Sequence, residues 1–263
     1  MSSATVLPRS RVRQGSRWCR MPTHLAVVLP PQQRRAEPRT VPVPGIARDL
    51  RVKFASTRNE WEQAFQLVAD NYQARGFEVG DADYRFTAYH ALPETVVLVA
   101  KEGEAVVATF SLVPDNALIG LPLESLYRQE IRGLRPGRRL FETGSLAERG
   151  LGLREFMQVF VTLMRLGWQH MTRRGFDTTV IAVNPRHVSF YTKQHGFASL
   201  GQRRSYAAVQ GAPAEAFYLD PALMKVRVPR MHQQMFGEPL PGKCLVAPRM
   251  PAELVRHFAR HSS

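Results

Sequence analysis

The stretch VIAVNPRHVSFYTKQHGF runs from Val180 to Phe197 and joins an apolar, β-branched run to an Asn-Pro corner. The run before the corner predicts a buried strand, and residues 186–195 after it predict a helix. Asn184 is a residue type that caps the first N–H groups of a helix, and Pro185 fits its first turn. The stretch therefore predicts a strand leading directly into a helix that carries His, Tyr and basic side chains.

The residues upstream complete a strand–helix–strand unit. Residues 138–148 predict a strand, and apolar residues recur at helical spacing between Phe156 and Met171. With the strand at 178–183, this unit predicts a right-handed crossover whose two strands are parallel. Ligands collect at the carboxyl ends of such strands, so we expect the active site between the segments FETGSLAERGLG (141–152) and NPRHVSFY (184–191).

The rest of the chain sets the fold class. Residues 50–57 predict a strand, and Thr57-Arg-Asn-Glu60 is a capping box that opens a helix. The stretch TVVLVAKEGEAVVATFSLVPD (95–115) predicts a hairpin, and residues 197–220 predict two more strands. This order predicts an α+β domain with a mixed central sheet flanked by helices.

The positive charge lies in the flanks of the chain. Residues 1–48 contain nine Arg and a single acidic residue, and residues 221–263 contain seven Lys or Arg and two acidic residues, which leaves the middle near neutral. We expect a disordered Arg/Pro-rich arm at 1–48, the catalytic domain at 49–220 and a basic extension at 221–263. A basic nucleic-acid-binding module is the non-enzyme alternative, but the flanks lack interleaved aromatic residues, so no nucleic acid is expected.

Two further observations bear on localisation. Only two cysteines are present, far apart, so neither a disulfide framework nor a CxxC metal site is indicated. No run approaches the roughly 18 apolar residues of a membrane span. We therefore expect a cytoplasmic protein without a transmembrane segment.

Several motifs resemble the GNAT acyltransferase superfamily, in which an Asn after a central strand is followed by a pattern like N-x-x-x-x-x-[FY]-Y and a later Gly-Phe. Here these residues are Asn184, Phe190, Tyr191, Gly196 and Phe197. More narrowly, three segments resemble the bacterial long-chain N-acyl amino acid synthases, which are related to the acyl-homoserine-lactone synthases. They are VVATFSLVPDNALIGLPLESLYRQEIRGLR, RRLFETGSLAE and VIAVNPRHVSFYTKQHGF. The resemblance spans about residues 50–220.

The resemblance implies an N-acyltransferase that moves a fatty acyl group from acyl carrier protein to the amine of an amino acid. Enzymes of the superfamily that use coenzyme A usually have a [QR]-x-x-G-x-[GA] loop for the pyrophosphate. Here Gly150 and Gly152 fit, Ala147 replaces Gln or Arg, and Arg149 is out of register. The departure favours an acyl-phosphopantetheine thioester on a carrier protein as donor substrate, with no bound cofactor. The alternative functions are a coenzyme A-dependent N-acetyltransferase and a homoserine-lactone-type synthase. The alternative role of Gly150 and Gly152 is purely structural, as a flexible connection between strand and helix.

The resemblance also assigns catalytic candidates. Glu142 lies on the strand facing the thioester and is suited to accept the ammonium proton, although a surface or salt-bridged Glu is the alternative. Related enzymes bulge this strand, and Gly144 and Ser145 are the expected place for a backbone oxyanion donor. Tyr191 occupies the position that often protonates the leaving thiolate, with ordinary packing as the alternative.

Substrate contacts are expected from Asn184, His187 and Phe190, together with the loop residues Arg149, Gly150 and Gly152. Asn184 first caps the helix. His187 and His195 lie eight residues apart without an evident third ligand, so no metal site is expected.

Carrier proteins are acidic, so a basic segment near the active site is a docking candidate. The segment IRGLRPGRRL (131–140) directly precedes the proposed catalytic strand. Its four arginines are expected to dock the carrier protein, against the alternative of a solvated loop: Arg132, Arg135, Arg138 and Arg139.

Overall fold

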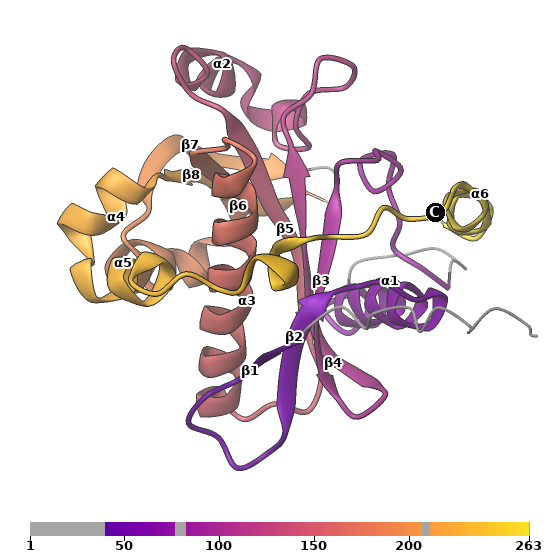
Figure 1. The fold of residues 1–263 in the computed structure, drawn as a ribbon. Helices are drawn as coiled ribbons and strands as arrows, with labels where there is room; N and C mark the ends of the chain where they lie inside the picture. The colour runs from indigo at the N-terminus through magenta and orange to yellow at the C-terminus, as the bar shows by residue number, and fades with distance from the viewer. Residues whose placement is uncertain (1–39, 77–82, 207–210, 263) are drawn as a thin grey trace, which may run out of the picture. The chain divides into compact units, whose positions relative to one another are not determined.

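The computed structural model describes residues 40–76, 83–206 and 211–262. It contains a mixed sheet of eight strands flanked by helices, as the sequence predicts (Figure 1). The strand order is β1-β2-β3-β4-β5-β6-β8-β7. Most of the predicted arm lies outside the described residues, and the division into three segments stays a prediction. The strands are β1 (Val41–Pro42), β2 (Leu50–Phe54), β3 (Val96–Glu102), β4 (Ala105–Pro114), β5 (Leu140–Glu148), β6 (Thr178–Val183), β7 (Ala198–Tyr206) and β8 (Ala212–Leu219).

The helices cover both faces of the sheet (Figure 1). On one face, α3 packs with the C-terminal α4 and α5; on the other lie α1, α2 and α6. The predicted helix at 186–195 is present as a 3-10 turn, η1, followed by a π-helical turn, η2. The helical elements are α1 (Arg58–Gln73), α2 (Glu124–Leu134), α3 (Leu153–Arg173), η1 (Pro185–His187), η2 (Phe190–Gln194), α4 (Pro221–Arg227), α5 (Pro229–Phe236), η4 (Gly242–Leu245) and α6 (Ala252–Arg260).

The crossover β5–α3–β6 organises the core. Strands β5 and β6 pair in parallel, whereas the other neighbouring strands of the sheet pair antiparallel. Helix α3 buries one face against the sheet, with Phe160, Leu163 and Trp168 in its main apolar cluster. Met224 and Met235 from the C-terminal helices join the same cluster. The C-terminal segment therefore contributes to the α3-side core.

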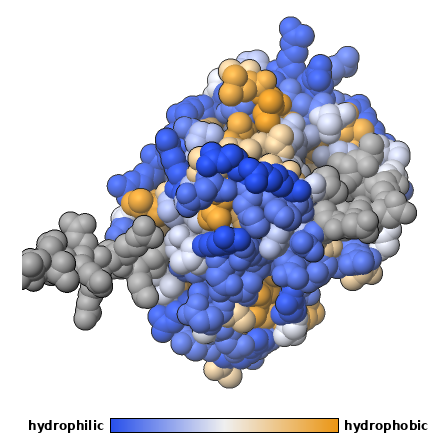
Figure 2. Space-filling model, turned by 90° about the vertical axis from the view of Figure 1, so that its right-hand side faces the viewer, coloured by the Kyte–Doolittle hydropathy of each residue, from blue (hydrophilic) through white to orange (hydrophobic). Residues whose placement is uncertain are grey.

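Helix α1 packs on the opposite face through Trp61 and Phe65, and Phe258 of α6 joins this second cluster. The outer surface over α1 and α6 is mainly hydrophilic, with smaller apolar areas (Figure 2). Within the described ranges, no helix combines the length and apolar character needed to cross a membrane.

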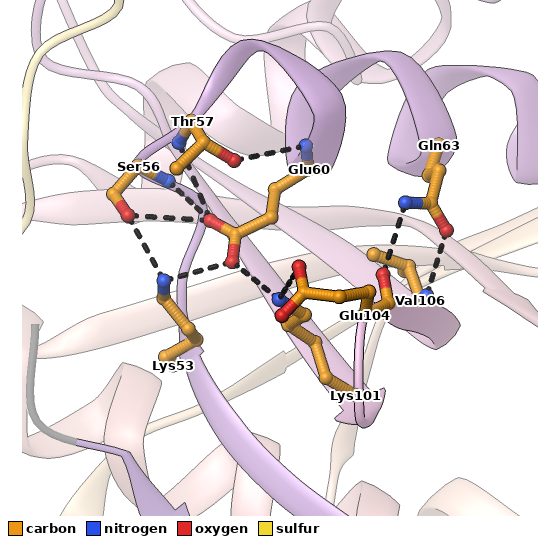
Figure 3. A network of polar contacts seen from close by, with 8 residues as sticks. All are labelled: Lys53, Ser56, Thr57, Glu60, Gln63, Lys101, Glu104 and Val106. Carbon is orange, nitrogen blue, oxygen red and sulfur yellow. Dashed lines mark hydrogen bonds and ion pairs between the residues drawn. The ribbon is translucent and has the colours of Figure 1, made fainter. Parts of the chain in front are cut away.

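A buried ion cluster fixes the start of α1 on the sheet (Figure 3). The Glu60 carboxylate accepts hydrogen bonds from Lys53 Nζ at 2.8 Å, Lys101 Nζ at 3.0 Å and the Ser56 backbone N–H at 2.9 Å. The predicted capping box is confirmed, because Thr57 and Glu60 each accept from the other's backbone N–H. One carboxylate thus ties α1 to both β2 and β3.

The ion cluster predicts a pH-dependent contribution to stability. Burial alone would raise the pKa of Glu60, but the hydrogen bonds from Lys53, Ser56 and Lys101 hold that pKa at about 2, below the ordinary 4.5. The carboxylate therefore stabilises the fold above about pH 5, and this contribution is lost as pH falls toward about 2. Glu60→Gln should lower the free energy of unfolding at pH 7 by about 3 kcal/mol in denaturant titrations.

The matched control is Glu104→Gln, because Glu104 also contacts Lys101 but its side chain is 91% exposed. This control should change stability by less than about 0.5 kcal/mol. Equal stability of Glu60→Gln and the unmodified protein at pH 7 would contradict the role given to the cluster.

Candidate active site

The site is built around a separation of two neighbouring strands. Strands β5 and β6 form parallel pairs from Leu140↔Thr178 to Glu142↔Val180 and then stop pairing. Beyond this point β5 continues on β4, and β6 continues on β8. The hydroxyls of Thr143 and Thr179 lie 2.9 Å apart where the strands part. We call the carboxyl-terminal parts of these strands, residues 143–148 and 181–183, the strand split.

A bulge in β5 lies within the strand split. Ser111 of β4 faces Gly144 of β5, and Thr109 faces Ala147, so β5 carries one extra residue between these pairs. Ser145 has φ +55°, and it is the one non-glycine residue with a positive φ in the described part of the chain. Such bulges turn the backbone away from the ladder and recur next to active sites. The bulge predicted at Gly144 and Ser145 is therefore present.

Glu142 occupies the last pair before the strands part. Its side chain lies on the α2 face of the sheet, is only 6% exposed, and accepts a 2.7 Å hydrogen bond from the Leu123 N–H. Burial raises the pKa of Glu142 to about 8; the Leu123 hydrogen bond opposes this shift and the nearby Glu124 charge adds to it. A buried carboxyl with this pKa can exchange a proton near neutral pH.

Polar side chains that the sequence interpretation missed lie on the same face. Burial raises the pKa of Tyr89 and brings that of Tyr206 to about 12, and the charge of Glu142 adds to both shifts. Ser111 lies beside Val113, the β4 partner of Glu142, on the same side of that strand. Ser111 could have been noticed in the sequence, because it is a polar residue inside the apolar run of β4. The irregular segment around Tyr89 has no pattern that would have pointed to Tyr89.

His90 holds the Ser111 hydroxyl in place. The Thr87 backbone N–H donates to His90 Nδ1 at 3.1 Å, which leaves the ring proton on Nε2 to donate to Ser111 Oγ at 3.2 Å. Burial, with a smaller effect of Arg85, lowers the pKa of His90 to about 4. His90 is therefore a neutral, buried donor.

Tyr191 lies on the opposite, α3 side of the sheet. Its ring packs edge-on against Phe160, Phe190 and Phe197, and burial raises the pKa of Tyr191 to about 12. In the described structure its hydroxyl makes no hydrogen bond. Tyr191 is therefore packed among aromatic rings, and Glu142 and Tyr191 lie on different faces of the sheet.

The residues after β6 are held locally. Asn184 caps η1 by accepting from the Arg186 N–H at 3.2 Å, as predicted. His187 Nε2 accepts from Arg186 Nε at 2.9 Å, and burial, with the charges of Arg186 and Arg75, lowers the pKa of His187. His195 is buried and lines an apolar pocket. No group of three His, Cys, Asp or Glu able to hold a metal occurs among residues 40–76, 83–206 and 211–262.

The loop between β5 and α3 lies at the carboxyl end of β5. Ala147 is buried in the α1-side cluster, and Arg149 donates to Asp70 at 2.8 Å. Gly150 has φ +66°, and Gly152 is the N-cap of α3. Of the three loop residues predicted to contact the substrate, Gly150 and Gly152 shape the backbone of the loop, whereas the Arg149 side chain binds Asp70.

The four arginines proposed for carrier docking lie before the amino end of β5, away from the strand split. Arg135 bonds to Asp115 and Glu124, and Arg138 bonds to Asp220 at 2.8 Å. Arg139 donates to the Arg174 carbonyl and is exposed, as is Arg132. The structure does not bring these residues together with Glu142 or Tyr191.

The eight-stranded mixed sheet with helices on both faces has the fold of the GNAT N-acyltransferases. A family model described as N-acyl amino acid synthase FeeM matches residues 63–220. The chain belongs to this FeeM family of N-acyl amino acid synthases and is an acyltransferase.

Solved structures agree with the fold. FeeM, an N-acyl amino acid synthase from uncultured soil microbes, is 23% identical with a TM-score of 0.58, over 72% of this chain and 96% of FeeM. The acyl-homoserine-lactone synthase LasI is 13% identical with a TM-score of 0.53, over 73% of this chain and 96% of LasI. MesI, a coenzyme A-dependent acyl-homoserine lactone synthase, is 15% identical with a TM-score of 0.50, over 72% of this chain and 96% of MesI. A comparison with curated proteins gave no significant match.

The raised pKa of Glu142 has a consequence for stability. A folded-state pKa of about 8, above the ordinary 4.5, makes the fold lose stability as pH rises between these values, because ionising the buried carboxyl is unfavourable. Glu142→Gln should therefore raise the melting temperature at pH 9 and change it little at pH 4. A variant less stable than the unmodified protein at pH 9 would show that the carboxylate is stabilised in the fold.

Proposed function

We propose that this protein joins a long-chain fatty acyl group, carried as an acyl carrier protein thioester, to the amine of an amino acid. The observation that carries the proposal is the buried Glu142 at the last pair before the strand split. Family membership supports the reaction class, and the chemistry of amide formation requires a group that removes a proton from the amine.

The reaction needs a neutral amine, a polarised carbonyl and a protonated leaving group. In this proposal the Glu142 carboxylate takes a proton from the ammonium group of the acceptor on the α2 face. The amine then attacks the thioester carbon, and a backbone N–H of the bulge at Gly144 and Ser145 binds the developing oxyanion. The C–N bond forms, and the C–S bond breaks as Tyr191 donates its proton to the departing thiolate from the α3 face. The nitrogen loses its second proton as the amide forms, and a proton returns to the Tyr191 phenolate through solvent.

A small apolar pocket on the α3 side is closely filled by side chains in this structure, and we propose that its methionines move aside to admit the acyl chain. Methionines are unbranched and flexible, so a methionine-lined pocket adapts to an aliphatic chain. The C-terminal segment supplies three of these methionines, and we propose that it completes the catalytic domain of residues 49–220. The pocket is lined by Val161, Met164, His195, Leu219, Met224, Met231 and Met235.

Mutation of the proposed base tests the mechanism. Glu142→Gln should keep the fold and lower kcat by roughly two to four orders of magnitude, because the amide cannot accept the ammonium proton. In the unmodified enzyme, kcat should rise with pH around the Glu142 pKa of about 8. A near-normal rate for Glu142→Gln at neutral pH would remove this residue from the mechanism.

Donor choice separates the proposal from a coenzyme A-dependent enzyme. The buried Ala147, where a pyrophosphate-binding Gln or Arg is expected, supports the carrier-protein donor. We expect kcat/KM for an acyl carrier protein thioester to exceed that for the matching coenzyme A thioester by more than about tenfold. Equal values for the two donors would contradict the assignment. A homoserine-lactone-type synthase, which the likeness to LasI favours, would instead release a lactone.

We propose that the carrier protein docks where the strand split opens. Arg154, Arg186 and Lys193 are exposed there, and no ion pair involves them within the described structure. Leu153, beside Arg154, is 80% exposed. Exposed cations next to an apolar side chain suit an acidic partner that is steered by charge.

Charge reversal tests the docking surface. The double variant Arg154→Glu and Lys193→Glu should raise KM for the carrier-protein thioester and leave a short pantetheine thioester unaffected, because only the carrier protein is acidic. The matched control is the double variant Arg132→Glu and Arg139→Glu. Both arginines are exposed and belong to the segment before β5 for which the sequence predicts docking. A KM increase confined to this second pair would place docking at the loop before β5.

A further inference from the structure

The N-terminus of α3 points toward the edge of the sheet at which the strand split opens. Helix α3 follows the carboxyl end of β5 after only the loop 149–152, and this loop carries Gly150 and Gly152. A glycine-rich loop leading into a helix ordinarily offers backbone N–H groups and a positive helix end to phosphate. Any phosphate on a donor that enters the strand split would therefore meet this loop.

In this chain, carboxylates of its own already occupy the loop. The Gly152 N–H donates to Glu155 Oε2 at 3.0 Å, and the Leu151 N–H donates to Glu148 Oε2 at 3.3 Å. Two N–H groups of the loop are thus bonded internally. The carboxylates also bring negative charge to the place where a phosphate would bind.

Arg48 holds this arrangement in place. Its Nη1 donates to Glu155 Oε2 at 3.2 Å and to the Gly150 carbonyl at 3.1 Å. Its Nε and Nη2 donate to the Glu102 carboxylate at 3.0 and 2.7 Å. One guanidinium therefore binds two carboxylates and the loop backbone, so it is not available to a phosphate. The nearby Arg154 donates to the Gly45 carbonyl.

We propose that Glu148 and Glu155, the second of which is fixed by Arg48, select against thioester donors that carry several phosphates. Coenzyme A bears a pyrophosphate and a 3′-phosphate, whereas carrier-bound pantetheine bears one phosphodiester. Repulsion, together with the internal bonding of the Leu151 and Gly152 N–H groups, disfavours the first far more than the second. This inference rests on the proposed function, because it requires an acyl thioester to enter at the strand split.

The test compares three donors with the same acyl chain: the coenzyme A thioester, the carrier-protein thioester and a pantetheine thioester without phosphate. Glu155→Gln keeps a side chain that can cap α3 but removes the charge. It should raise kcat/KM for the coenzyme A thioester about five- to tenfold and leave the pantetheine thioester unchanged. Free coenzyme A should also bind more tightly in calorimetry, a readout that does not depend on turnover.

Arg48→Gln is the matched control, because it disrupts the same network with the opposite change in charge. It should lower or leave unchanged the use of coenzyme A thioester, whereas Glu148→Gln should act in the same direction as Glu155→Gln. A similar increase in all three variants would mean that the loop has merely been loosened, and no increase in either Glu variant would equally overturn the proposal.

The donor assignment and this inference can fail separately. An unmodified enzyme that prefers the coenzyme A thioester to the carrier-protein thioester would refute the donor assignment. The ratio of coenzyme A to pantetheine turnover in Glu155→Gln would still decide whether the carboxylates act against phosphate.

Discussion

Strands β5 and β6 hydrogen-bond to each other over three residue pairs and then separate, and the site depends on this short parallel contact. The crossover through α3 forces the two strands to run in the same direction, so their carboxyl ends open at one edge. The bulge at Ser145 turns the backbone of β5 where its partner on β6 is lost. A longer pairing would close the sheet between the faces that carry Glu142 and Tyr191.

The two faces of the sheet carry different side chains, and the proposed reaction divides its steps between them. On the α2 side, Glu142 and Ser111 are embedded among apolar residues with few hydrogen-bond partners, and His90 is held neutral. On the α3 side, aromatic rings and methionines surround Tyr191 and the neighbouring pocket. Proton removal from a polar acceptor fits the first face, and accommodation of an aliphatic chain fits the second. Burial among apolar residues makes ionisation of Glu142 unfavourable and so raises its pKa.

Local sequence patterns predict much of this architecture because they reflect local physics. The spacing of apolar residues in the two strands and the helix between them predicts the β5–α3–β6 crossover, and the capping box of Thr57 and Glu60 predicts the start of α1. Glu142 and the bulge were predicted through resemblance, and the structure adds the burial that raises the pKa of the carboxyl to about 8. Long-range contacts were invisible: Ser111 pairs with a histidine 21 residues earlier, and Arg138 with an aspartate 82 residues later. Charge counting alone therefore suggested a docking role for an arginine that has an internal partner.

The proposed reaction is tested most directly by identifying its product. The purified enzyme would be incubated with a long-chain acyl carrier protein thioester and a mixture of amino acids, and the lipid extract would be analysed by high-resolution mass spectrometry. We expect a fatty acyl amide of an amino acid that retains a free carboxylate, formed together with free carrier-protein thiol. Release of only free fatty acid, or of an acyl lactone, would contradict the proposed reaction.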